Sequence, residues 1–227
     1  MKFAAMIFDM DGTMLDTERT YREVFNRAAA DCGVEFTESL HFELLGRNSR
    51  DTEKLLLSRW NDPALCGRFF ERCRHHHGEC FEKAPLEMKP GLLELLDFLE
   101  QRKIPKIVAT STRRSNAIPR LTKANLLHRF ASVTTGDQVQ HGKPAPDLFL
   151  LAASTISVQP AECIVLEDSE AGVDGAHAAG MSVFMIPDMK QPCEATRGRA
   201  TAVCGSLIEV KQRLEELLPT NLTNRHE

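Results

Sequence analysis

Residues 3–18 read FAAMIFDMDGTMLDTE, and this stretch decides which fold we expect. Residues 3–8 are uniformly apolar, which is typical of a strand buried on both faces of a parallel sheet. The apolar run then ends abruptly in Asp9 and Asp11, and Gly12 follows them. Ligands of such sheets bind beyond the carboxyl ends of the strands, so this pattern indicates that the two carboxylates serve a site there.

Similar short apolar runs recur along the chain. We expect strands at 106–109, 163–166 and 183–186, and a weaker candidate lies near Val133. Helical patterns separate them, as in PGLLELLDFLEQRK (90–103), where leucines form one apolar stripe and acids lie opposite. Strands that alternate with helices need crossover connections, which predicts an α/β fold with a doubly wound, Rossmann-like parallel sheet.

The alternation is interrupted once, between residues 17 and 84, where only helical stretches are found. An all-helical block inserted directly after the first strand predicts a second module. We therefore expect a core domain of residues 1–16 and 85–227 and a helical-bundle cap of residues 17–84. The hinges would lie near Asp16–Thr17 and near Pro85–Pro90.

The bulk composition narrows the classes of function. The 227 residues include 28 basic and 32 acidic side chains, giving a net charge of −4, whereas nucleic-acid binders rely on a surplus of Lys and Arg. The seven cysteines are odd in number and form no C-x-x-C pair, which favours a reducing, cytoplasmic compartment. No segment is apolar over the length needed to span a bilayer. We expect a cytoplasmic monomer without nucleic-acid or membrane partners.

Four segments carry polar side chains that would meet at one edge of the predicted sheet. They supply Asp9 and Asp11 after the first strand, Thr110 and Ser111 in KIVATS (106–111), Lys143 in HGKPAPD (141–147), and Glu167 and Asp168 in IVLEDS (164–169). Carboxylates at this density suit Mg²⁺, while a lysine, hydroxyls and free backbone N–H groups suit phosphate oxygens. A carboxylate can also attack phosphorus, and Mg²⁺ then offsets the repulsion between two anions.

These motifs are similar to those of a known family. DMDGT, ATS, GKPAPD and LEDS, in this order and spacing, resemble the four signatures of the haloacid dehalogenase (HAD) superfamily. FDMDGTMLDTE and the helical block behind it resemble the branch with a helical cap after the first strand, which includes β-phosphoglucomutase-like and pseudouridine-5′-phosphatase-like enzymes. The resemblance covers nearly the whole chain.

The resemblance implies a role for each matching residue. Asp9 would be the nucleophile, and Asp11 would protonate the leaving oxygen and later deprotonate water. Thr110, Ser111 and Lys143 would hold the phosphate. The implied Mg²⁺ ligands are Asp9, Asp11 through its carbonyl, Glu167 and Asp168. The dehalogenases that give the superfamily its name use no metal, so the acids of LEDS favour a phosphatase-type member.

Two features of the helical block invite a functional interpretation. In capped members of the family, the loop that matches LLGRNSRD (44–51) often contacts the non-phosphate part of the substrate, so Arg47 and Arg50 are candidate substrate residues, the alternative being ordinary surface charge. In RHHHGEC (74–80), consecutive helical residues point about 100° apart, so the three histidines cannot converge on one metal ion. We expect a solvated helix end there.

These observations predict a Mg²⁺-dependent phosphatase that hydrolyses a sugar phosphate or nucleoside monophosphate through an aspartyl-phosphate. The alternative is a phosphosugar mutase of the β-phosphoglucomutase kind. Such mutases typically carry a histidine twelve residues after the nucleophile, where this chain has Tyr21. That difference favours hydrolysis without deciding the question. A non-catalytic phosphorylated receiver domain would lack the helical insertion.

Overall fold

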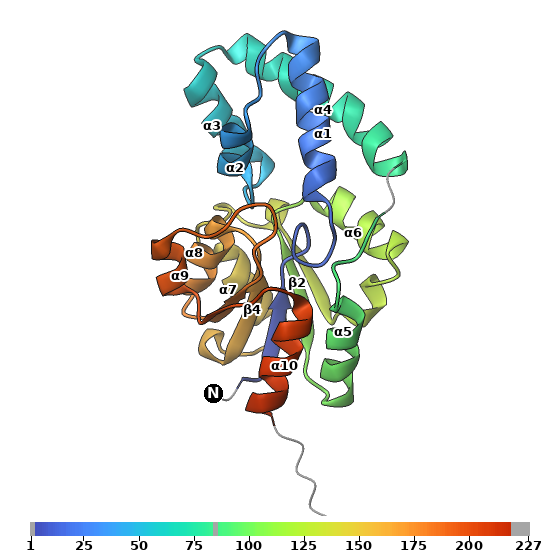
Figure 1. Ribbon diagram of the computed structural model, residues 1–227, viewed down its shortest axis with the longest axis vertical. Coiled ribbons are helices and arrows are strands. Elements are labelled where there is room, and N and C mark those ends of the chain that lie inside the picture. The colour runs from blue at the N-terminus through green and yellow to red at the C-terminus, as the bar shows by residue number, and fades with distance from the viewer. Residues whose placement is uncertain (1–2, 84–85, 219–227) are drawn as a thin grey trace, which may run out of the picture.

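The fold expected from the sequence is confirmed by a computed structural model, which describes residues 3–83 and 86–218. Its centre is a six-stranded parallel sheet with the strand order β3-β2-β1-β4-β5-β6 (Figure 1). The strands are β1 (Ala5–Phe8), β2 (Lys106–Thr110), β3 (Ser132–Thr135), β4 (Cys163–Glu167), β5 (Ser182–Met185) and β6 (Ala202–Val203). The order reverses direction at β1, as in other doubly wound sheets.

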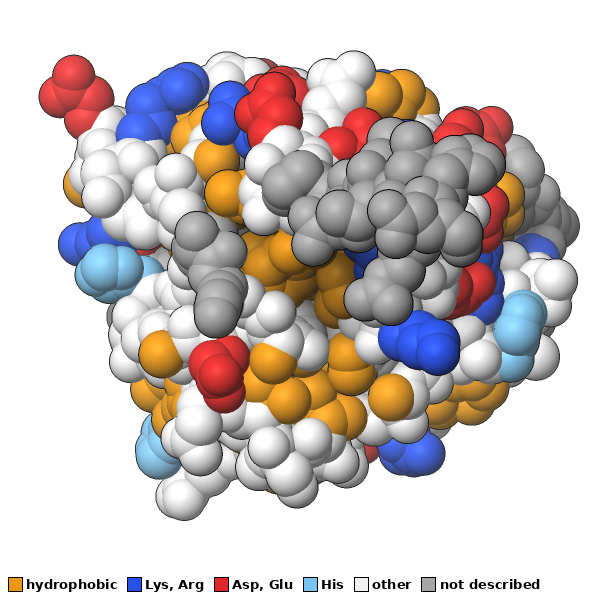
Figure 2. Space-filling view, turned by 90° about the horizontal axis from the view of Figure 1, so that it is seen from below, with side chains coloured by type: hydrophobic (Ala, Val, Ile, Leu, Met, Phe, Trp, Pro, Cys, Tyr) orange, Lys and Arg blue, Asp and Glu red, His pale blue; other side chains and the backbone are white. Residues whose placement is uncertain are grey.

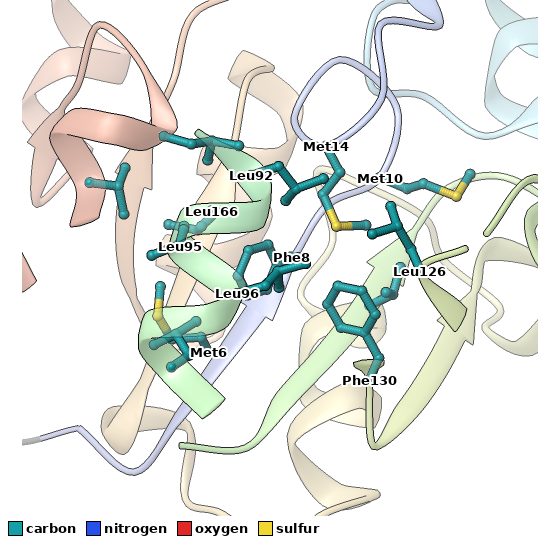
Figure 3. Close-up of a cluster of buried hydrophobic side chains, with 14 of the residues drawn as sticks. Met6, Phe8, Met10, Met14, Leu92, Leu95, Leu96, Leu126, Phe130 and Leu166 are labelled. Atoms are coloured by element: carbon teal, nitrogen blue, oxygen red, sulfur yellow. The ribbon is translucent and has the colours of Figure 1, made fainter. Parts of the chain in front are cut away.

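The strand β1 shows why the sheet needs a helical layer on each face. Its side chains alternate, so Met6 and Phe8 join one hydrophobic cluster and Ala5 and Ile7 join another. The first cluster contains residues of α5 (Leu92–Gln101), α6 (Arg114–Lys123) and α10 (Leu207–Leu217), and part of it is drawn in Figure 3. The second contains residues of α7 (Asp147–Ser154) and α8 (Glu170–Ala178). A strand covered in this way must be apolar throughout.

The helical insertion packs on itself. Its helices are α1 (Glu18–Cys32), α2 (Glu38–Leu44), α3 (Ser49–Trp60) and α4 (Pro63–Lys83), which stand together at one end of the sheet in Figure 1. They share a third hydrophobic cluster, which includes Val24, Leu56 and Phe69 and no residue of the sheet or its covering helices. The expected boundary between residues 84 and 85 lies outside the described residues, and the division into two domains stays a prediction.

Several elements were not expected from the sequence. They include the two-residue edge strand β6 and the helices α6, α9 (Glu194–Arg199) and α10. Three short 3-10 helices complete the described structure at Leu127–Arg129, Gly136–Gln138 and Pro160–Glu162. None of the described helices is both long enough and apolar enough to cross a membrane. The end of the molecule opposite to the insertion exposes hydrophobic side chains among charged ones (Figure 2).

Candidate active site

The predicted site residues come from strands that end at the same edge of the sheet. Phe8 is in register with Val108 of β2 and with Leu166 of β4, so the residues that follow these three strands are neighbours. A cavity of about 570 Å³ lies at this edge, between the core and the helical insertion. Asp9, Asp11, Thr110 and Ser111 line it from the core side. The structure therefore brings residues from β1 and β2 to one cavity.

Lys143 forms hydrogen bonds with two of the predicted acids, Asp9 and Glu167. Its side chain is fully buried, and its Nζ donates to Oδ1 of Asp9 at 2.5 Å and to Oε1 of Glu167. Burial lowers the pKa of Lys143, but the charges of Asp9 and Glu167 raise it by more, so the lysine stays charged. A charged lysine here partly neutralises two buried carboxylates.

Glu167 has protein partners on both of its oxygens. Oε1 accepts from Lys143, and Oε2 accepts from the backbone N and the hydroxyl of Ser169, each at 2.9 Å. Gly172 packs directly against this carboxylate, since a Cβ at Gly172 would lie 1.9 Å from Oε1. These contacts hold Glu167 beside Lys143, and its role as a metal ligand stays a prediction.

Asp168 lies beside the loop that carries Asp11. Its Oδ1 accepts from the hydroxyl of Thr13 at 3.0 Å, and a Cβ on Gly12 would lie 2.3 Å from its Oδ2. Gly12 also has φ +84°, so only glycine fits this close approach without strain. Burial, followed by the charges of Glu167 and Asp9, raises the pKa of Asp168 well above its usual range.

The donor set can be compared with what a divalent cation needs. Burial also raises the pKa of Asp9, and the charges of Glu167 and Asp11 add to the effect of burial, while Lys143 opposes it. Within the described residues, no three His, Cys, Asp or Glu side chains form a ready metal-binding group. Mg²⁺ is nevertheless commonly held by one or two carboxylates, with waters and a substrate phosphate as its other ligands. Asp9 and Asp168, together with the carbonyl of Asp11, fit that smaller set.

Asp11 is held by four donors. Its Oδ1 accepts from Thr17 Oγ1 at 2.7 Å and from Arg120 Nη1 at 2.9 Å. Its Oδ2 accepts from Thr112 Oγ1 at 2.7 Å and, less closely, from Thr110 Oγ1 at 3.4 Å. Thr110 also accepts from the backbone N of Thr112, so the loop after β2 is tied to Asp11. The side chain of Asp11 therefore has a fixed orientation at the cavity wall.

Arg120 and Glu18 were not predicted as site residues. Arg120 lies in α6, is 6% exposed and forms an ion pair with Asp11. Glu18 opens α1, lines the cavity and is 8% exposed. Burial, together with the charges of Asp11 and Asp9, raises its pKa to about 8. No local pattern marks either residue, because each becomes buried only when the insertion packs over the core.

The remaining predicted residues lie where the insertion meets the core. Ser111 donates to the carbonyl of Gly46 at 2.8 Å. Arg47 lines the cavity and donates to the carbonyl of Glu43 at 2.8 Å. Arg50 instead donates to the carbonyl of Gln140, on an exposed loop of the core, at 2.6 Å. Of the two arginines, Arg47 therefore has the better position to contact a substrate.

The expectation of a solvated helix end at residues 74–80 is wrong for His77. This histidine is half-buried and lines the cavity. The distance from its Nε2 to Nη2 of Arg120 is 2.8 Å. Burial and the charge of Arg120 lower the pKa of His77 to about 4. The helix α4 passes close to α6 at His77, so this side chain is not free in solvent.

Comparisons with known proteins identify a family that the chain matches. The family model described as "Haloacid dehalogenase-like hydrolase" matches residues 6–186, which include every predicted site residue. The chain is 35% identical over 177 residues to "Phosphorylated carbohydrates phosphatase" of Thermotoga maritima, covering 78% of this chain and 82% of that protein. It is 30% identical over 216 residues to "Probable pseudouridine-5'-phosphatase" of Drosophila melanogaster, covering 92% of each.

A solved structure gives a similar result. A Thermotoga maritima protein, provisionally described as a beta-phosphoglucomutase, superposes with a TM-score of 0.73 at 32% sequence identity. The match covers 96% of this chain and 100% of that chain. The similarity thus extends over the helical insertion as well as the sheet.

Proposed function

The chain belongs to the haloacid dehalogenase-like hydrolases and is a phosphoric monoester hydrolase, and on this premise we propose that it hydrolyses a small phosphorylated metabolite through an aspartyl-phosphate on Asp9. The observation that carries the proposal is that Asp9 and Asp11 line one cavity, with Lys143 bonded to Asp9. A sugar phosphate or a nucleoside monophosphate is the proposed substrate class, because the cavity has far more room than a phosphate needs.

In the first half of the reaction, a carboxylate oxygen of Asp9 attacks the phosphorus atom of the substrate. The bond between phosphorus and the ester oxygen breaks, and the leaving oxygen takes a proton from Asp11. Lys143 and the hydroxyls of Thr110 and Ser111 hold the phosphoryl oxygens. This role requires Ser111 to exchange its contact with Gly46 for one with the substrate.

In the second half, Asp11 acts as a base. It accepts a proton from water, whose oxygen attacks the phosphorus atom, and the bond between phosphorus and Asp9 breaks to release phosphate. Asp9, Asp168 and the carbonyl of Asp11 would hold a divalent cation, whose positive charge would offset the repulsion between the carboxylate and the phosphate. We propose that this cation is Mg²⁺, and that Glu167 contributes by holding Lys143.

The experiment is a screen of phosphorylated metabolites for phosphate release in the presence of Mg²⁺, with p-nitrophenyl phosphate as a general substrate. Asp9→Asn is expected to lower turnover by at least about 10³-fold, since it removes the nucleophile, while its circular dichroism spectrum stays that of the wild type. Turnover of this variant near the wild-type rate would overturn the assignment of Asp9.

The mutase alternative is supported by the solved relative described provisionally as a beta-phosphoglucomutase. The structure gives an argument against it at Tyr21, which stands where such mutases typically carry a histidine and instead accepts from Arg120 at 2.7 Å. The two activities are separated by a hexose 1-phosphate mixed with catalytic bisphosphate. We expect free phosphate, whereas accumulation of the 6-phosphate would establish the mutase.

The thiols support a cytoplasmic location. No disulfide joins any of the seven cysteines, all of which lie in the described residues, and five of them are buried, as is usual for a protein kept in a reducing compartment. We propose that the enzyme works there on a soluble metabolite.

A further inference from the structure

We propose that Arg120 is a positioning residue for Asp11, and that its contacts with Tyr21 and His77 make the placement of Asp11 depend on the closed position of the helical insertion. The proposal rests on the proposed function, because it assigns a task to Asp11. It concerns one side chain of α6 that reaches both the proposed acid of the reaction and two helices of the insertion.

On the core side, Arg120 provides the charged contact of Asp11. The other three donors to this carboxylate are threonine hydroxyls, which can rotate and find other partners. Arg120 donates from Nη1 to Oδ1 at 2.9 Å, and both side chains are largely buried, at 7% and 11% exposure. A buried ion pair of this kind fixes the orientation of a carboxylate more firmly than a hydroxyl does.

On the insertion side, the same guanidinium contacts α1 and α4. Nη1 also donates to the hydroxyl of Tyr21 at 2.7 Å, and Nη2 lies 2.8 Å from Nε2 of His77. Arginine can only donate, so the Nε2 of His77 must accept, with the ring neutral. The guanidinium also lies over the ring of Phe81, at 3.9 Å from its centroid, in a cation–π contact.

These contacts link the insertion to Asp11 mechanically. Arg120 can reach Asp11, Tyr21 and His77 together only while α1 and α4 are seated against α6. If the insertion moved away, Arg120 would lose two polar partners and the ring contact, and it would no longer be held in the orientation that Asp11 requires. Closure of the insertion would thereby complete the site, as closing lids do in other enzymes.

Arg120 acts through Asp11 and not on the substrate directly. Among the described residues that line the cavity are Asp11, Tyr21 and His77, and Arg120 lies behind them. Its loss should therefore impair the proton transfer of Asp11 more than the binding of substrate. That distinction can be measured, because a good leaving group departs without a proton and a poor one does not.

The test compares Arg120→Gln with the wild type on p-nitrophenyl phosphate, which has a good leaving group, and on the best alkyl phosphate from the metabolite screen. We expect kcat/KM for the alkyl phosphate to fall by about 10²-fold, within the range of general acid catalysis, and by at least about tenfold less for p-nitrophenyl phosphate. We expect KM to change by less than about threefold. Equal losses on both substrates, or no loss, would overturn the proposal.

Two further variants keep the test decisive if Arg120→Gln folds poorly. Tyr21→Phe removes the hydroxyl that accepts from Arg120 and lies 3.4 Å from the hydroxyl of Thr112. It should give the same bias against the alkyl phosphate, of about three- to tenfold. Arg129→Gln is the matched control. Arg129 also lies outside the insertion and forms ion pairs, with Glu100 and Asp97. It does not line the cavity, so its variant should keep wild-type kinetics.

The outcomes separate this proposal from the proposed function. If the wild type releases no phosphate from any substrate, the proposed function fails. If the wild type is active, and Arg120→Gln and Tyr21→Phe show no bias toward the better leaving group, only the role of Arg120 fails.

Discussion

At the scale of single residues, Lys143 has a strong electrostatic effect on the site. It is the buried cation that contacts both Asp9 and Glu167, whose side chains are 7% and 1% exposed. Removing one partner of a buried ion pair leaves uncompensated charge, which typically costs about 3–5 kcal/mol. We therefore expect Lys143→Met to lower the free energy of unfolding by about that amount at pH 7, measured by urea denaturation.

Lys106 offers the matched control for this prediction. Its side chain is also buried, but its partner Glu100 is 43% exposed, so water can solvate the carboxylate when the lysine is lost. Lys106→Met should cost about 1 kcal/mol or less. Equal losses for the two variants would show that the carboxylates near Lys143 are solvated, contrary to the structure.

Glu18 predicts a pH dependence of stability. Its pKa of about 8 in the folded state lies above the ordinary value of 4.5. Burial is the largest cause of this increase, and the negative charges of Asp11 and Asp9 raise the pKa further. Between these pH values the unfolded chain has lost the proton that the folded state keeps, so this group makes the protein less stable as pH rises. Glu18→Gln should be more stable than the wild type by roughly 2–5 kcal/mol at pH 8 and by under about 1 kcal/mol at pH 5.

This difference is measured by chemical denaturation with a metal chelator present, so that cation binding does not contribute. Glutamine has the shape of the protonated glutamate, which isolates the effect of charge. An advantage of Glu18→Gln that stays constant between pH 5 and pH 8 would contradict a raised pKa of Glu18.

The site residues that the sequence could predict are those whose position follows from the strand before them. Asp9, Thr110 and Asp168 each lie at the end of a buried strand or directly after it, so their place at the sheet edge follows from topology. Arg120 and Glu18 lie on helices with no such neighbour. Their burial depends on how the insertion sits on the core, and this is a long-range property that no local pattern contains.

At the scale of elements, the loop after α2 makes a close contact between the insertion and the core. Gly46 has φ +73°, and a Cβ there would lie 2.2 Å from Oγ of Ser169, which caps α8 and holds Glu167. Gly46→Ala should therefore displace the loop or Ser169. A displacement near 1 Å can cost about 10²-fold in rate, so we expect kcat/KM to fall by at least about tenfold.

The control for Gly46 is Gly33, the residue after α1. Its φ of +68° is nearly the same, but no atom lies within 4 Å of a Cβ placed on it. Both alanine variants incur the backbone strain, roughly 1–2 kcal/mol, and the melting temperature of Gly46→Ala should fall further because of the contact with Ser169. Only Gly46→Ala should lose activity. If both variants keep full activity, the close approach at Ser169 does not matter for catalysis.

The elements themselves were predictable to different degrees. The central strands could be predicted because burial on both faces requires uninterrupted apolar runs. The edge strand β6 has two residues, which pair with Phe184 and Met185, and this is too short for any periodic signal. The helix α6 buries Ala117, Arg120 and Leu121, of which one is charged, and it contains Pro119, so the apolar stripe in its sequence RSNAIPRLTK is weak.

At the scale of the whole molecule, the insertion and the core have separate hydrophobic clusters, and the cavity lies where they meet. The polar contacts across this junction include those of Arg120, Ser111 and Arg50. This junction has few contacts compared with the hydrophobic clusters inside the insertion and inside the core. Movement of the insertion relative to the core therefore costs less free energy than unfolding either part. A closing motion is therefore compatible with the architecture.

The buried acids of the site predict how the stability of the folded molecule responds to a divalent cation. Asp9 and Glu167 share a single lysine, and Asp168 adds a further negative charge beside them. Burial raises the pKa of both aspartates, so bound Mg²⁺ should stabilise the folded state. A ligand at 100 times its dissociation constant contributes about 2.7 kcal/mol, which corresponds to about 5–10 °C in melting temperature for a chain of this size. Scanning calorimetry with and without MgCl₂, at matched ionic strength, measures this shift.

Asp168→Asn should lose most of the shift, while Asp174→Asn, which removes an exposed acid paired with Arg199, should keep all of it. A shift of equal size in both variants would mean that Mg²⁺ stabilises the protein from somewhere other than the acids at the end of β4.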